Sequence, residues 1–425
     1  MPTRRLLVVT YPYPPMPSVG GNRWLAMAKY LRRRGHQVEI LTTSAFGALP
    51  EDAANGVHRS TDLIAAPWLR TLLRRPPLPK PGETAAVDKP PQAFITHILV
   101  PDHNVATWVP YATRLARRLI RDRGFDCLIT TSAYESAHLV GLALGRGRPA
   151  WIADFRDGWT FHPWRPPFPT QFQRRLDLRL EKAVVTTAER TIVVEQPVAD
   201  DFRGRLGVDA GYVPNGWDPE LEQEMDGARA PEVDQARLTL VHTGKLSGDW
   251  GRSPRPLFQA LHRLREREPA LARRLELVLA GRLDFSEQRM IAEAGLDGIV
   301  RHVGMLTRAE SMLLQRQADV LVLLTSPTLV WELPGKVFEY FGARRPILAL
   351  AKGNEAERVI RETATGWTVA PDDVDAISAQ LESLIRDGAE LKLDESRLAR
   401  YIYPAPADAL EQEIERACQV RAVHP

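Results

Sequence analysis

Short apolar runs alternate with longer helical patterns from one end of the 425-residue chain to the other. RLLVVT (residues 5–10) and LELVLA (residues 275–280) are two such runs, and a stretch with helical periodicity follows each of them. Strands that are separated by helices usually pair in parallel, because the chain returns to the same edge of the sheet before each new strand. The alternation therefore predicts an α/β fold of parallel sheets with helices on both faces.

The expected strands form two series. They are residues 5–10, 37–42, 126–130, 150–154, 191–194 and 211–213, and then residues 238–242, 275–280, 300–303, 319–324, 346–350 and 366–369. One sheet of about twelve strands would be unusually large, so two doubly wound, Rossmann-like domains are the simpler prediction. The polar segment 216–236 contains Gly and Pro and is typical of a linker. It would join an N-terminal domain at 1–215 to a C-terminal domain at 237–404.

Charge and composition exclude several classes of protein. The net charge is +3 and 44% of the residues are apolar, which is ordinary for a globular enzyme and gives no general argument for nucleic-acid binding. With two cysteines and no long apolar run, a reducing cytoplasm is the expected location. The basic, Pro-rich segment 66–80 suggests peripheral contact with the inner face of a membrane, but a solvated loop is the favoured interpretation.

In open α/β sheets, ligands bind outside the carboxyl ends of the strands, so the loops after strands are the candidate sites. The first such loop, YPPMPSVGGNR (residues 13–23), ends in Gly20 and Gly21 immediately before a helix. Glycines at a helix N-terminus allow close approach of a phosphate, although a plain turn explains the pair equally well. Arg23 is either part of that anion site or the anchor of a salt bridge.

A second loop, WIADFRDGW (residues 151–159), follows an expected strand with a cluster of charges. Asp154 and Asp157 flank Arg156, an arrangement that suits a site for hydroxyl groups and developing charge. The alternative is an ion pair that pins the loop. Trp159 and His162 lie just beyond. Together with Arg156 they are the candidates for contacting the substrate that would react at this loop, here called the acceptor.

The third loop, HTGKLSGDWGR (residues 242–252), begins the second series of strands. Gly244 ends the strand, and Lys245 and Arg252 place two cations in a glycine-containing loop. This combination suits a diphosphate, whose charge the cations would offset as a nucleotide departs.

The fourth loop, WELPGKVFEYFGARRPIL (residues 331–348), is the most specific stretch of the chain. Pro334, Gly335 and Lys336 open a helix whose N–H groups can hold a phosphate. Glu339, one turn further on, can accept hydrogen bonds from two ribose hydroxyls.

Taken together, these motifs resemble the retaining, nucleotide-sugar-dependent glycosyltransferases of family 4, in the branch with a DxRDxW loop. The resemblance also rests on LRRRGHQVEILT, ITTSAYESAHLVGLAL and VPNGWDP, and it covers nearly the whole chain. It implies the GT-B fold, in which two Rossmann-like domains face each other across a cleft. The C-terminal domain would bind the donor, the N-terminal domain the acceptor, and the last helix, 405–425, would pack back near the N-terminal domain.

The resemblance also implies roles for individual residues. Gly20 and Gly21 match the family's glycine loop near the donor phosphates, and Lys245 occupies a position where many members have arginine. Glu339 matches the second, ribose-binding glutamate of the family's glutamate pair. The first glutamate would fall at Trp331, with Glu332 beside it, which leaves open whether Glu332 replaces it. Either Asp154 or Asp157 would lie near the reacting carbon.

The expected function is that of a retaining hexosyltransferase that uses no metal ion or cofactor. The co-substrate would be a nucleotide-diphosphate sugar, with UDP favoured over GDP or dTDP, and the acceptor a hydroxyl of a small molecule, natural product or glycan. One alternative is a GT-B relative that couples a cyclitol or rare sugar, or that uses a nitrogen or sulfur acceptor. Another is a non-catalytic, nucleotide-binding GT-B subunit.

Overall fold

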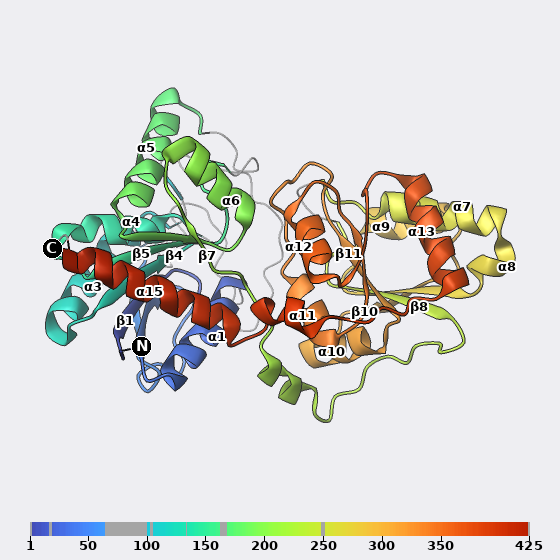
Figure 1. Ribbon diagram of the computed structural model, residues 1–425, viewed down its shortest axis with the longest axis horizontal. Helices are drawn as coiled ribbons and strands as arrows, with labels where there is room; N and C mark the ends of the chain where they lie inside the picture. The colour runs from blue at the N-terminus through green and yellow to red at the C-terminus, as the bar shows by residue number, and fades with distance from the viewer. Residues whose placement is uncertain are drawn as a thin grey trace. The chain divides into compact units, whose positions relative to one another are not determined.

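The computed structural model describes residues 2–16, 19–63, 100–102, 105–132, 134–161, 168–247 and 251–423. These residues form two compact units (Figure 1). Unit 1 comprises Met1–Pro214 and Pro406–Pro425, and unit 2 comprises Asn215–Ala405. The basic segment 66–80 and His162 lie outside the described residues. Within the described part of the chain, no helix is both long and apolar enough to span a membrane.

Unit 1 contains a parallel seven-stranded sheet in the order β3-β2-β1-β4-β5-β6-β7. Its strands are β1 (Arg5–Thr10), β2 (Gln37–Thr43), β3 (Val57–Ser60), β4 (Cys127–Thr131), β5 (Ala150–Phe155), β6 (Arg190–Val193) and β7 (Gly211–Tyr212). Its helices are α1 (Val19–Arg33), α3 (Val109–Arg123), α4 (Ser136–Leu144), α5 (Gln171–Thr187), α6 (Gln196–Asp201) and α15 (Ala405–Val423). The strand order reverses between β1 and β4, which is the switch point where such sheets bind ligands.

The packing of unit 1 follows from the alternation of side chains along each strand. Leu7 and Val9 of β1 point to one face, where they pack with Trp108 and Ala112 beside α3. The C-terminal helix α15 packs against the same unit (Figure 1), and charge pairs tie it there. In one of these pairs, Arg4 makes two hydrogen bonds of 2.9 Å to Glu415.

Unit 2 contains a parallel six-stranded sheet in the order β10-β9-β8-β11-β12-β13. Its strands are β8 (Leu238–Thr243), β9 (Leu275–Ala280), β10 (Val300–Gly304), β11 (Val320–Leu324), β12 (Ile347–Leu350) and β13 (Gly366–Val369). Its helices are α7 (Arg255–Arg267), α8 (Pro269–Ala272), α9 (Phe285–Glu293), α10 (Arg308–Gln317), α11 (Lys336–Ala343), α12 (Glu355–Thr363), α13 (Val374–Asp387) and α14 (Glu395–Leu398). Neighbouring side chains of β8 lie on opposite faces of the sheet and belong to different core clusters. Leu240 packs with α7 and α13, and Val241 packs with α10, α11 and α12.

All twelve predicted strands are present within two residues of their expected ends, and the α/β prediction is confirmed. The edge strand β3 (Val57–Ser60) was missed because its sequence, VHRS, is short and mostly polar. Residues 216–236, predicted to be a linker, are part of unit 2. They include a 3₁₀ helix (Pro219–Met225), and the buried side chains of Trp217 and Met225 belong to a core cluster of that unit.

Gly342 of α11 provides a test of this packing. A Cβ atom at Gly342 would lie 2.2 Å from Cε2 of the buried Trp217 ring. In an open helical position, Gly→Ala stabilises by about 0.5–1 kcal/mol, but overpacking a core costs about 1–3 kcal/mol. Gly342→Ala is therefore expected to lower the melting temperature by several degrees. Gly204→Ala, where a Cβ atom meets nothing within 4 Å, should not lower it. A Gly342→Ala protein as stable as the wild type would contradict this packing.

Candidate functional site

In unit 2, the start of α11 holds the loop that follows β8. Lys336 Nζ lies 2.7 Å from the carbonyl oxygen of Thr243 and 3.5 Å from that of Lys245. It also lies 3.1 Å from Nε2 of His242. His242 Nδ1 is 2.9 Å from the Val322 carbonyl oxygen and donates to it, so Nε2 accepts a hydrogen bond from Lys336. All three donors of the ammonium thus have protein partners, and we assign Lys336 to positioning this loop.

Burial and nearby charge change the titration of this lysine and its histidine neighbour. Burial, followed by the charge of Arg252, lowers the pKa of Lys336 to about 7. Burial, followed by the charge of Lys336, places the pKa of His242 well below its usual range. His242 is therefore neutral near neutral pH, whereas Lys336 can exchange its proton there.

A second contact joins Arg252 to Glu332. Arg252 Nη1 lies 3.7 Å from Glu332 Oε1, and Arg252 Nε donates to the carbonyl oxygen of Leu246 at 3.1 Å. The other carboxylate oxygen of Glu332 accepts from the backbone N–H of Ser326 at 2.6 Å. Burial raises the pKa of Glu332, while Ser326 and Arg252 oppose this rise. Glu332 therefore orients one of the two predicted diphosphate cations.

Glu339 is linked to the same strand end through a glutamine that the sequence analysis did not identify. Gln315 is fully buried, and its Nε2 donates to Thr243 Oγ1 at 2.9 Å and to Glu339 Oε2 at 3.4 Å. Gln315 lies in α10, 72 residues from Thr243, and no local motif marks it. Its amide positions the carboxylate of Glu339.

Two of the predicted donor-binding features of unit 2 are exposed: the cation Lys245 and the N-terminus of α11. Lys245 is exposed, and its side chain makes no hydrogen bond within the described part of the chain. Gly335, which follows Pro334, occupies the N-cap position of the eight-residue α11 and has no side chain to cap the helix. Gly244 has a φ of +87°, a conformation that favours glycine, so the chain can turn between β8 and Lys245.

In unit 1, Arg23 of α1 and Asp154 of β5 form a buried pair. Their side chains are 2% and 0% exposed, and Arg23 Nη2 lies 3.5 Å from Asp154 Oδ1. Arg23 also donates to the carbonyl oxygens of Pro214 at 2.8 Å and Val213 at 3.0 Å. Asp154 Oδ2 accepts from Thr131 Oγ1 at 2.9 Å. The pair therefore anchors α1 to the sheet, and Asp154 has no exposed atom to offer a substrate.

The next residues of the DFRDGW loop differ in accessibility. Asp157 is partly exposed, whereas Trp159 is fully buried. Trp159 Nε1 donates to Asp177 Oδ1 of α5 at 2.8 Å. Trp159, predicted on the acceptor side, thus has no face free to stack on a substrate, because its ring fills the core beneath the loop. The guanidinium of Arg156 lies against Gly20 at the start of α1, which brings the first two predicted loops together.

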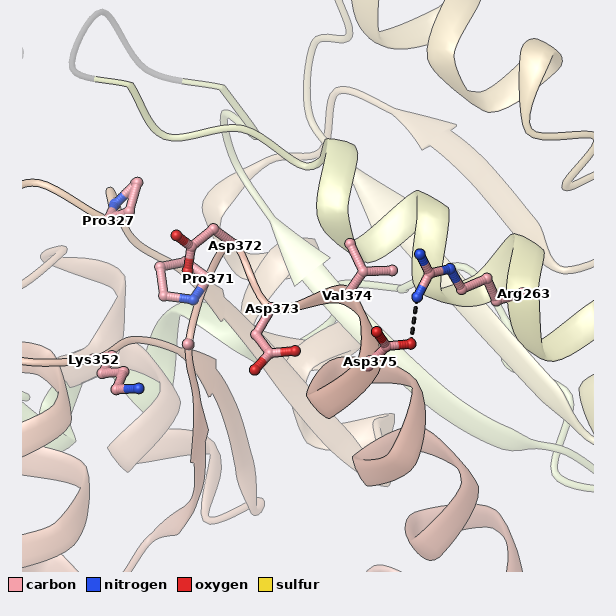
Figure 2. A pocket seen from close by; sticks show the side chains of 9 residues that line it. Arg263, Pro327, Lys352, Pro371, Asp372, Asp373, Val374 and Asp375 are labelled. Atoms are coloured by element: carbon pink, nitrogen blue, oxygen red, sulfur yellow. Dashed lines mark hydrogen bonds and ion pairs between the residues drawn. The ribbon is translucent and has the colours of Figure 1, made fainter.

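A cavity of about 670 Å³ lies at the carboxyl ends of β12 and β13 in unit 2 (Figure 2). Its lining residues are Arg263, Pro327, Lys352, Ala370, Pro371, Asp372, Asp373, Val374 and Asp375. Two of its carboxylates already have partners: Asp375 pairs with Arg263, and Asp373 caps α13 through the N–H of Ala376 at 2.9 Å. None of the residues predicted to bind the donor lines this cavity, so we do not assign the site to it.

Comparisons with known proteins identify the family and the fold of the chain. Residues 20–221 match the Glycosyltransferase Family 4 model, and residues 237–387 match the model of Glycosyl transferases group 1. The structure is similar to that of a sucrose-phosphate synthase from Thermosynechococcus elongatus, with a TM-score of 0.65 and 16% identity over 99% of this chain and 100% of that one. None of the curated proteins compared with the chain matches it.

Two further solved structures share the fold. A glycosyltransferase from Rickettsia africae gives a TM-score of 0.59 at 13% identity, over 99% of both chains. The S. aureus MnaA–UDP structure gives 0.51 at 11% identity, over 98% of both chains. Identities this low show a common fold and nothing finer.

Proposed function

Since the chain belongs to the GT-B glycosyltransferases of family 4, we propose that unit 2 binds a nucleotide-diphosphate sugar and that unit 1 binds the acceptor. The observation that carries the proposal is that the loop bearing Lys245 is bonded to Lys336 at the start of α11, close to Glu339 and Arg252, at the carboxyl ends of β8 and β11. Two cations and a helix N-terminus suit a diphosphate, and a carboxylate one turn into the helix suits ribose hydroxyls.

The proposed reaction proceeds on one face of the sugar with retention of configuration. The acceptor oxygen bonds to the anomeric carbon as the bond from that carbon to the phosphate oxygen breaks. The acceptor's proton passes to the departing phosphate oxygen. Lys245 and Arg252 stabilise the negative charge that develops on the diphosphate, which is the role that a metal ion has in other transferases.

The difference in burial between the two aspartates of the DFRDGW loop supports separate roles for them. Asp154 is fully buried and paired with Arg23, so we propose that it positions α1 and the loop. Asp157 is partly exposed, and we propose that it contacts the acceptor. An Asp157→Asn protein should therefore show a raised KM for the acceptor and little change in the KM for the donor.

A panel of nucleoside diphosphates and their sugars tests the proposed function. A ligand that binds only the folded protein raises the melting temperature, by an amount equivalent to about 2.7 kcal/mol at a concentration 100 times its Kd. We expect UDP to stabilise the protein more than GDP or dTDP does. Mass spectrometry of products should then show sugar transfer with the matching donor in the presence of excess EDTA. Stabilisation without transfer to any acceptor would indicate a nucleotide-binding subunit instead.

Donor binding is expected to depend on pH through Lys336, whose pKa of about 7 lies well below that of a free lysine. Above this pH the unliganded side chain loses its proton, whereas a diphosphate bound at the loop favours the ammonium. Binding should therefore take up a proton, and the Kd for UDP should rise by up to about tenfold per pH unit above neutrality. Calorimetry in two buffers with different ionisation enthalpies measures this uptake.

Lys336→Met keeps the length of the side chain and removes its charge. This variant should bind UDP without taking up a proton at about pH 8. Equal proton uptake by the wild type and the variant would show that another group titrates.

A further inference from the structure

The two cysteines of the chain come from distant parts of the sequence and meet in unit 1. Cys127 is the first residue of β4, and its side chain is fully buried. Cys418 lies in α15 and is partly exposed. Its Sγ atom is 3.8 Å from the carbonyl oxygen of Asp126, the residue before Cys127. The two thiols are close enough to form a hydrogen bond with each other, and both are free.

Arg4 holds the strand and the helix together beside these thiols. Its Nε and Nη2 atoms donate to the two carboxylate oxygens of Glu415 at 2.9 Å, and its Nη1 lies 3.9 Å from Asp126 Oδ1. Asp126 is adjacent to Cys127 in the chain. Glu415 lies one helical turn before Cys418, on the same side of α15. The two sulfur atoms are therefore kept next to each other by contacts other than their own.

Cys418 has the properties of the thiol that reacts first. The hydrogen bond with Cys127, followed by the positive charge of Arg4, lowers the pKa of the Cys418 thiol. Burial and the charges of Glu415 and Asp126 oppose this effect. Burial, by contrast, raises the pKa of Cys127. Because the thiolate is the nucleophile, an accessible thiol of lowered pKa beside a buried second thiol is typical of a redox-sensitive pair.

We propose that Cys127 and Cys418 form a site of reversible oxidation, at which hydrogen peroxide converts the two thiols into a disulfide that links β4 to α15. This site does not depend on the proposed function, because neither cysteine belongs to the groups assigned to the donor or the acceptor. A disulfide at this place is compatible with a reducing environment, where such bonds form transiently and serve redox sensing.

The oxidation takes place in two steps. The Cys418 thiolate attacks one oxygen of the peroxide, and the O–O bond breaks to leave a sulfenic acid and a hydroxide, which takes up the proton that Cys418 has lost. The sulfur of Cys127 then bonds to the Cys418 sulfur as the S–O bond breaks, and the Cys127 proton leaves with that oxygen as water. Two thiols and one hydrogen peroxide thus give one disulfide and two water molecules.

Mass spectrometry of the full chain after treatment with hydrogen peroxide tests the site. The wild-type protein should lose about 2 Da, and both thiols should become unreactive towards iodoacetamide together. Digestion without reductant should give one cross-linked pair of peptides that contain Cys127 and Cys418. Dithiothreitol should restore both thiols.

Single variants separate the two steps of the oxidation. In Cys127→Ala the sulfenic acid of Cys418 has no thiol to react with, so it should proceed to the sulfinic acid, a gain of about 32 Da. Cys418→Ser should keep the buried Cys127 thiol unoxidised. If peroxide carries Cys418 of the wild type to the sulfinic acid without a cross-link, the proposed site is wrong. Cross-links that form only between two molecules would also refute it.

Arg4→Gln tests the clamp without changing either sulfur atom. The variant loses the charge near Cys418 and the ion pair with Glu415, so its disulfide should form several-fold more slowly at limiting peroxide. Arg416→Gln, at an exposed arginine of the same helix, is the matched control and should be oxidised as fast as the wild type. Equal rates for Arg4→Gln and the wild type would show that Arg4 does not position or activate the pair.

The disulfide should also stabilise the protein. A link between residues so far apart in the chain restricts the unfolded state strongly, provided that the native packing accommodates the bond. Peroxide-treated wild type should therefore melt several degrees above the reduced protein and return to its original melting temperature with dithiothreitol. Cys418→Ser, treated in the same way, controls for oxidation elsewhere and should show no such rise. A lower melting temperature of the cross-linked protein would contradict the close placement of the two thiols.

Discussion

Lys245→Ala is expected to lower kcat for sugar transfer by about 10²–10³-fold, the usual cost of removing one group that stabilises charge in a transition state. Lys245 is exposed and makes no side-chain hydrogen bond within the described residues, so the fold should not depend on it. The melting temperature should therefore stay close to that of the wild type. Steady-state kinetics with the donor selected from the nucleotide panel measures the effect.

The pattern of kinetic constants distinguishes catalysis from simple binding. If Lys245 acts mainly on the leaving diphosphate, kcat should fall more than the KM for the donor rises. Lys392→Ala, at an exposed lysine of the same unit, controls for loss of surface charge and should retain full activity. Near-normal turnover of Lys245→Ala with the true donor would remove Lys245 from the proposed mechanism.

Glu339→Gln is expected to raise the Kd for UDP by about 10–100-fold, because hydrogen bonds to a charged group contribute about 1.5–3 kcal/mol. Glutamine keeps the shape of the side chain, and among the residues that the structure describes the Glu339 side chain makes one hydrogen bond, at 3.4 Å with Gln315. The substitution should therefore weaken UDP binding with little effect on the stability of the fold. Calorimetry with UDP measures the loss.

Removing one ribose hydroxyl from the ligand provides a more specific test of the role of Glu339. Wild-type protein should prefer UDP to 2′-deoxy-UDP, since Glu339 is proposed to bind both ribose hydroxyls, and Glu339→Gln should lose most of that preference. Glu390→Gln, at an exposed glutamate, should retain it. If the variant discriminates between the two nucleotides as the wild type does, Glu339 is not the ribose ligand.

Local sequence patterns predicted the elements of the fold but not the contacts within the site. Apolar runs gave the strands, and glycines, charges and a proline marked the loops that follow β1, β5, β8 and β11. The periodicity of side chains repeats over a few residues, so it can be read without knowledge of the partner strand. The edge strand β3 was missed because a short, mostly polar strand has little hydrophobic periodicity.

The tertiary structure decided what each site residue does. It paired Lys336 with His242 across 94 positions and Arg23 with Asp154 across 131, and it buried Trp159. These pairings depend on which strands become neighbours at the carboxyl edge of a sheet, and no local pattern encodes that. The sequence by itself thus determined two parallel α/β sheets and the loops that carry the chemistry. Only the packing showed that Lys336 and Asp154 hold the loops in place, because their partners come from distant parts of the chain.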